Sequence, residues 1–94
     1  MNPTDFRHEV EALLDKYGAR VHRLRKILVD GKPVLVVEFI AQRAQYEAFE
    51  AEVLETGYSF YLYHYEHWTS REMLGQEYFY TIAIAPPGAF TFVS

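Results

Sequence analysis

Cysteine is absent from the 94 residues, which excludes disulfide bonds, thiolate catalysis and every metal site that needs a thiolate ligand. No apolar run reaches the roughly 18–20 residues that a membrane-spanning helix needs. The first residues carry Asp5 where a secretion signal would place positive charge and then an apolar stretch. A glycine-rich phosphate loop, a nucleophile elbow and a zinc-binding helix motif are also missing. We therefore expect a cytoplasmic protein with no cofactor and no metal.

With 50% hydrophobic and 23% charged residues, the sequence has the composition of a soluble globular protein. The length corresponds to a single domain, residues 1–94. The net charge of −4 argues against a generic nucleic-acid binder, which gains affinity from many lysines and arginines. The charges are unevenly placed, however. Bases are concentrated between Arg20 and Lys32, and the segment from Ala44 to Glu55 carries only acids.

The first half of the chain predicts a helix followed by a hairpin. Apolar residues at helical spacing indicate a helix that begins near Pro3 or Thr4 and ends at Gly18. Two apolar runs, 20–29 and 34–41, flank Asp30-Gly31, a dipeptide that tolerates the positive φ angles of a tight hairpin turn. A two-residue loop would place Arg23 opposite Glu38 and Leu24 opposite Val37. The second run is apolar on both faces apart from Glu38, so it should lie inside the sheet.

The second half repeats this order. Residues 42–55 predict a helix, 58–68 a strand, 69–75 a single helical turn, 77–85 another strand, and 89–93 a short closing strand after the turn at Pro86-Pro87-Gly88. We therefore predict an α+β fold with element order α-β-β-α-β-β-β. Two helices should pack on one face of a mainly antiparallel sheet of about five strands.

Aromatic residues make up 17% of the chain, and tyrosines dominate the third strand. Strict alternation puts Phe60 and Leu62 beneath the helices, together with His64 and Glu66. The opposite, open face would then carry tyrosines from this strand and one parity of the next; the candidate binding tyrosines are Tyr61, Tyr63, Tyr65, Tyr78 and Tyr80. Tyrosine gives a large contact area with a hydroxyl group that tolerates water, and it is enriched at protein interfaces. The alternative is that these rings only stiffen the sheet.

Alternation also places Arg23 and Arg25 on this open face, and Arg20 on the other. The leading hypothesis is a small recognition module, more consistent with binding than with catalysis, that contacts a protein partner or its own copy through the tyrosines. An inhibitor or immunity-type role is one form of this hypothesis, in which helix acids such as Glu47 and Glu50 engage a basic target. Single-stranded nucleic acid, held by stacked tyrosines and arginines, is another alternative.

The densest polar cluster lies at the end of the tyrosine strand. His64 and Glu66 share one face two residues apart, so they are weak candidates for a general acid/base pair. A pocket formed with Trp68 would make the protein a small-molecule enzyme or binding protein. His64 and His67 point to opposite faces of a regular strand and should not share a metal ion.

Residues 66–74, with Glu66, Trp68, Ser70, Glu72 and Leu74 in the pattern E-x-W-x-S-x-E-x-L, resemble a local pattern of the antibiotic biosynthesis monooxygenase-type domains. That resemblance implies a small ferredoxin-like fold that dimerises through its sheets, and in some members cofactor-free oxidation of aromatic substrates. It covers about nine residues. The predicted order of elements departs from the family, because two helices and a hairpin precede the motif, and we do not assign the chain to it.

Overall fold

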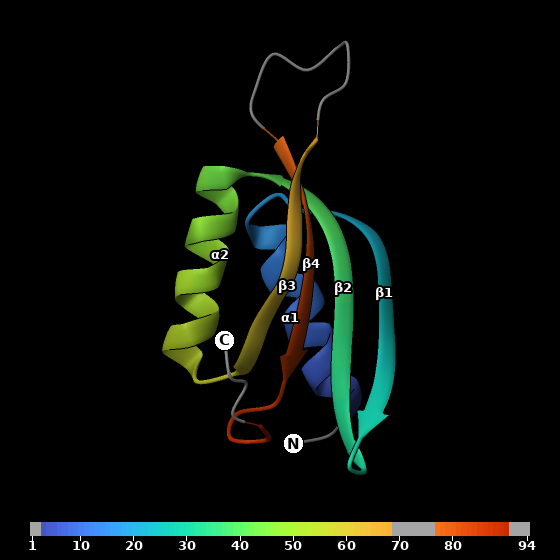
Figure 1. Ribbon diagram of the computed structural model, residues 1–94. Helices are drawn as coiled ribbons and strands as arrows, with labels where there is room; N and C mark the ends of the chain where they lie inside the picture. Colours follow the sequence, from blue (N-terminus) through green and yellow to red (C-terminus); the bar gives the residue numbers. More distant parts are fainter. Residues whose placement is uncertain (1–2, 69–76, 91–94) are drawn as a thin grey trace.

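The computed structural model describes residues 3–68 and 77–90 as two helices and four strands (Figure 1). In chain order these are α1 (Pro3–Lys16), β1 (Arg20–Val29), β2 (Lys32–Gln42), α2 (Arg43–Thr56), β3 (Ser59–Trp68) and β4 (Glu77–Ala85). Each predicted boundary that falls on these elements lies within two residues of the observed one. No helix within the described ranges is long and apolar enough to cross a membrane.

The hairpin between β1 and β2 turns at Asp30 and Gly31, as predicted. Both residues have positive φ, 52° and 76°, which matches the right-handed twist of the two strands. This turn fixes the predicted register, with Arg23 opposite Glu38 and Leu24 opposite Val37. The predicted pairing across these strands is therefore confirmed, although the charged groups of Arg23 and Glu38 form no ion pair among the described residues.

The sheet is antiparallel throughout, with strand order β1-β2-β4-β3. β2 lies in its interior, as its two-sided apolar sequence predicts. The described residues form four strands rather than five, because Ala89 donates its N–H back to Pro86 in a turn and neither Ala89 nor Phe90 joins a strand. The rest of the predicted closing strand, and the helical turn predicted at 69–75, lie outside the described residues.

The two α-β-β halves are arranged alike, with β2 and β4 in the centre and β1 and β3 at the edges. Each helix ends at a glycine with positive φ, Gly18 at 72° and Gly57 at 86°. This conformation lets the chain reverse into the following strand at low steric cost. The buried helix residues Val10 and Leu14 stand at the same spacing before Gly18 as Phe49 and Val53 do before Gly57.

Both helices pack on the same face of the sheet (Figure 1), as predicted. The main core joins one stripe from each helix to alternate residues of the central strands; its largest fully buried side chains are Phe6, Phe39, Phe49, Leu14, Leu35, Ile82 and Ile84. Phe39 contacts Phe49 of α2 with ring centroids 5.7 Å apart and Tyr80 of β4 at 5.4 Å. The core is therefore aromatic where α2 crosses the centre of the sheet.

Each edge strand contains one extra residue that interrupts the regular alternation. In β1 the register shifts between Val21 and Arg23, and in β3 between Leu62 and His64. The extra residues are His22 and Tyr63. A bulge of this kind reverses the face to which all later side chains of the strand point. Alternation counted from the sequence therefore fails on one side of each bulge.

Among residues 3–68 and 77–90, only one end of the second face of the sheet is covered. Ala89 and Phe90, in the segment after β4, pack there against Val34, Ala83 and Ala85. Ser59 holds this segment, because its hydroxyl group donates to the Phe90 carbonyl at 2.8 Å and accepts from the Phe90 N–H at 3.0 Å. The remainder of this face, toward the other end of β3, is called the uncovered face below.

Candidate binding surfaces

The second face of the sheet carries three rows of side chains that run across all four strands. Two of them lie on the uncovered face, and the third borders residues 89–90, which pack on its Ala83. The strand registers define the rows as Arg20–Ile40–Phe79–Glu66, Arg23–Glu38–Thr81–His64 and Arg25–Val36–Ala83–Tyr61. Each row begins with an arginine on β1, passes over mostly apolar residues on β2 and β4, and ends on β3 with Glu66, His64 or Tyr61. The face therefore has a basic edge and an acidic or aromatic edge.

The basic edge consists of Arg20, Arg23 and Arg25, although strict alternation assigns Arg20 to the other face. Arg23 and Arg25 lie on this side of the sheet as predicted. Arg20 joins them because the extra residue His22 reverses the alternation before it. Arg20 donates two hydrogen bonds to the Glu77 carboxylate, at 2.9 and 3.1 Å. The bulge thus lines up three bases along one strand.

The tyrosines of the predicted binding surface divide between the two sides of the sheet. Tyr61 lies on the uncovered side, and the Tyr63 ring contacts it edge-on with centroids 5.0 Å apart. Tyr65 follows the bulge and lies opposite Tyr80 on the helix side, where Tyr78 also lies. The prediction that Tyr65 is on the open face is therefore wrong, because the extra residue at Tyr63 reverses β3. Tyr78 and Tyr80 do not join that face either, because the alternation of β4 places Phe79 there instead.

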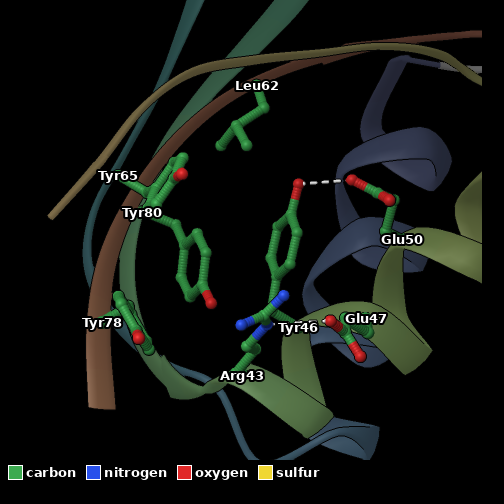
Figure 2. Close-up of a pocket in the computed structure, with 8 residues that line it drawn as sticks. All are labelled: Arg43, Tyr46, Glu47, Glu50, Leu62, Tyr65, Tyr78 and Tyr80. Carbon is green, nitrogen blue, oxygen red and sulfur yellow. Dashed lines mark hydrogen bonds and ion pairs between the residues drawn. The ribbon is translucent and has the colours of Figure 1, made fainter. Parts of the chain in front are cut away.

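The tyrosines on the helix side line a cleft of about 300 Å³ between the start of α2 and the ends of β3 and β4 (Figure 2). The strands contribute Leu62, Tyr65, Tyr78 and Tyr80, and α2 contributes Arg43, Tyr46, Glu47 and Glu50. This volume is at the lower end of the range for small-molecule sites.

A stacked pair of rings lies at the centre of this cleft. Tyr46 and Tyr80 are parallel to within 8°, with centroids 4.0 Å apart. The Tyr46 hydroxyl group donates to Glu50 at 2.6 Å (Figure 2). Burial raises the pKa of Tyr46, and the bond to Glu50 raises it further. Burial also raises the pKa of Tyr80 to about 12. Both phenols are therefore neutral at physiological pH.

The charged residues of the cleft are unequally compensated. Arg43 donates from Nε to Glu47 at 3.0 Å, and this hydrogen bond raises the pKa of Arg43. Glu50 has no cationic partner among the described residues and accepts only the phenol proton of Tyr46. One carboxylate in the cleft therefore keeps an unneutralised charge.

The weak catalytic candidates do not belong to this cleft. His64 and Glu66 share a face, as predicted, but it is the uncovered face and not the helix side. Their side chains are mostly exposed, and His64 Nε2 lies 4.0 Å from Glu66 Oε2. His67 contacts Tyr78 at 5.2 Å and therefore lies across the sheet from His64. Within residues 3–68 and 77–90 no three potential ligands gather at a metal site.

Three acids of α2 that could engage a basic target already have partners inside the chain. Glu47 pairs with Arg43, Glu50 accepts from Tyr46, and Glu52 accepts from both Lys16 at 2.7 Å and Tyr17 at 2.6 Å. They connect α2 to its own surroundings. The inhibitor or immunity-type role stays a prediction.

Comparisons of the chain with protein-family models, with curated proteins and with solved structures find no match. The candidate surfaces are therefore interpreted from their own geometry.

Sequence reasoning missed the cleft, although it singled out several of its residues. Tyr46 is typical of a core-facing helix position, and nothing in the sequence pairs it with the next two strands. No local signal marks the bulge that turns Tyr65 toward the cleft, because a bulge needs no glycine or proline.

Proposed function

We propose that this protein is a recognition module that acts by binding and not by catalysis. Its uncovered face is the contact surface, and the occupant is a second copy of the chain. The observation that carries the proposal is the order within the rows, which places arginines along one edge of this face and Glu66 and Tyr61 on the opposite edge.

A face of this kind is complementary to itself in only one of the two ways in which sheets can pair by two-fold symmetry. If the axis runs parallel to the strands, β1 of each copy lies over β3 of the other and each row meets the same row. Arg20 then faces Glu66 of the second copy, and Arg25 faces Tyr61 of the second copy. If the axis crosses the strands, the two basic edges meet and repel each other. Charge therefore selects the first arrangement.

The side chains at the centre of the face suit a pair of sheets about 10 Å apart. Ile40 and Phe79 are apolar and half-buried and would meet between the two copies. Glu38 would face Thr81 of the second copy, whose hydroxyl group can donate to it. An arginine over a tyrosine ring adds a cation–π contact. Tyr63, 58% exposed, adds a large ring next to Tyr61.

The first test is the association state of the purified chain, measured by sedimentation equilibrium. We expect a reversible dimer whose Kd rises about tenfold in Tyr63→Ala, as for the loss of an aromatic ring from an interface. Tyr65→Ala is the matched control, because Tyr65 is equally exposed but lies on the helix side. A chain that stays monomeric at all concentrations, or that responds equally to both substitutions, contradicts the proposal.

The arrangement of the two copies is tested by charge reversal. Glu66→Arg should weaken the dimer, and adding Arg20→Glu to the same chain should restore it, since each new pair is again of opposite charge. Glu55→Arg, which makes the same change on an exposed position of α2, should have no effect. Thermal unfolding of each variant checks the fold, since Arg20 also pairs with Glu77. A monomer that retains a single-stranded oligonucleotide would instead favour the nucleic-acid alternative.

A further inference from the structure

We infer that the cleft between α2 and the β3–β4 strands is a second binding site, for an organic ammonium ion. This site is independent of the uncovered face, because it lies on the opposite side of the sheet. The inference rests on three features of the cleft: its ring surfaces, its uncompensated carboxylate and its unused phenol hydroxyl groups.

The ring surfaces come from both elements that border the cleft. Tyr46 and Tyr80 are buried, stack on each other and form the floor of the cleft. Tyr65 and Tyr78 provide the more accessible rings beside them, with centroids 6.3 Å apart and planes inclined by 64° (Figure 2). Tyr65 is 58% exposed, so much of its ring is accessible. The electron-rich faces of tyrosine rings attract organic cations, whose diffuse charge loses little hydration when it contacts a ring.

The charge in the cleft has the sign that such a cation needs. Glu47 and Arg43 neutralise each other across 3.0 Å, which leaves Glu50 as the net charge. The hydrogen bond from Tyr46 holds the Glu50 carboxylate at the wall of the cleft without neutralising it. A bound anion would lie next to this carboxylate and would be repelled. A neutral apolar ligand would leave its charge uncompensated.

The phenol hydroxyl groups provide acceptors for an ammonium ion that carries N–H groups. Those of Tyr65, Tyr78 and Tyr80 make no hydrogen bond to any described residue. Each phenol oxygen can accept a hydrogen bond. Quaternary ammonium ions would use the ring faces alone, and protonated amines would use both features. The ligand class is therefore a small organic ammonium compound.

The test compares two probes of the same shape, choline and its neutral isostere 3,3-dimethylbutan-1-ol, in titrations of the ¹⁵N-labelled full chain followed by NMR. We expect saturable shifts of the amides of Tyr46, Tyr65 and Tyr80 with choline, and at least tenfold weaker binding of the alcohol. Equal binding of both probes would show an apolar cleft only. Absence of saturable shifts with choline would overturn the inference.

The contribution of the carboxylate is tested in Glu50→Gln, which keeps the acceptor oxygen and the size of the side chain. We expect about tenfold weaker choline binding than in the parent chain. Glu55→Gln is the matched control, because it removes the same charge from an exposed position of the same helix. If Glu50→Gln does not fold, Tyr65→Leu should weaken choline binding and Tyr63→Leu should not. Equal effects within either pair contradict the site.

Discussion

Tyr63 and Tyr65 are both 58% exposed, yet they belong to opposite sides of the same sheet. Tyr63 is the extra residue of the bulge in β3, and its ring contacts Tyr61. Tyr65 pairs with Tyr80 and lines the cleft beneath α2. One inserted residue therefore divides the alternating tyrosines of β3 between two candidate binding surfaces.

Deletion of Tyr63 should destabilise the fold more than its replacement. Without the extra residue, the strand must turn either Phe60 and Leu62 away from the core or Tyr65 away from the cleft, since a slip of one residue exchanges the faces. We expect the free energy of unfolding to fall by more than about 2 kcal/mol, a large effect for one residue. Tyr63→Ala should cost well under half of that. Urea denaturation measures both, and equal stabilities would mean that the register is not fixed by the bulge.

Gly18→Ala should cost more than Gly57→Ala, although both glycines end a helix with positive φ. An added methyl group at Gly57 meets nothing within 4 Å, so only the left-handed conformation disfavours it, by about 1 kcal/mol. At Gly18 the methyl group would lie 2.8 Å from Nε2 of Gln45. Gln45 also accepts a hydrogen bond from the Gln42 N–H at the start of α2.

The difference between the two glycine variants should be about 1 kcal/mol or more, measured by thermal unfolding. The matched experiment repeats Gly18→Ala in a Gln45→Ala background, where the contact is gone and the cost should approach that of Gly57→Ala. If the cost of Gly18→Ala is unchanged in that background, the contact with Gln45 is not its cause.

Glu52 should make the stability fall at acid pH. Hydrogen bonds from Lys16 and Tyr17 lower the pKa of Glu52 below its ordinary value of 4.5. The unfolded chain therefore takes up the proton more readily than the folded chain. The stabilisation is complete above pH about 4.5 and is lost as the pH falls through the lower pKa of the folded state. Urea midpoints between pH 3 and 6 should show this loss in the parent chain and in Glu55→Gln, but less of it in Glu52→Gln.

Tyr58 and Tyr80 should make the stability fall at alkaline pH. Burial raises the pKa of both phenols from 10.0 to about 12, and Tyr58 also donates to Glu9 at 2.6 Å. The unfolded chain loses these protons first, so the contribution of the two phenols to stability is constant below pH 10 and is lost between pH 10 and 12. Phenolate absorbance in a pH titration, followed alongside circular dichroism, measures this. Phenols that all ionise near pH 10 while the chain stays folded would contradict it.

Residues whose structure depends on local chemistry were predictable. The Asp30-Gly31 turn fixed the β1–β2 register, the apolar run of β2 placed that strand inside the sheet, and Gly18 and Gly57 ended the helices. The course of the chain after β4 was not predictable. A strand was expected from Ala89, but the turn from Pro86 to Ala89 carries the chain across the second face, where Ser59 holds Phe90. That contact joins segments far apart in the chain and leaves no local pattern.

The candidate surfaces divide in the same way. Local sequence was sufficient to name the tyrosines and the arginines, and to place the two helices on one face, because helical spacing and strand alternation are properties of neighbouring residues. Which side Tyr65 and Arg20 occupy depended on the bulges in β3 and β1, and a bulge is set by how a strand pairs with its neighbour. The cleft required tertiary structure altogether, since Tyr46 meets Tyr80 only when α2 packs across the sheet.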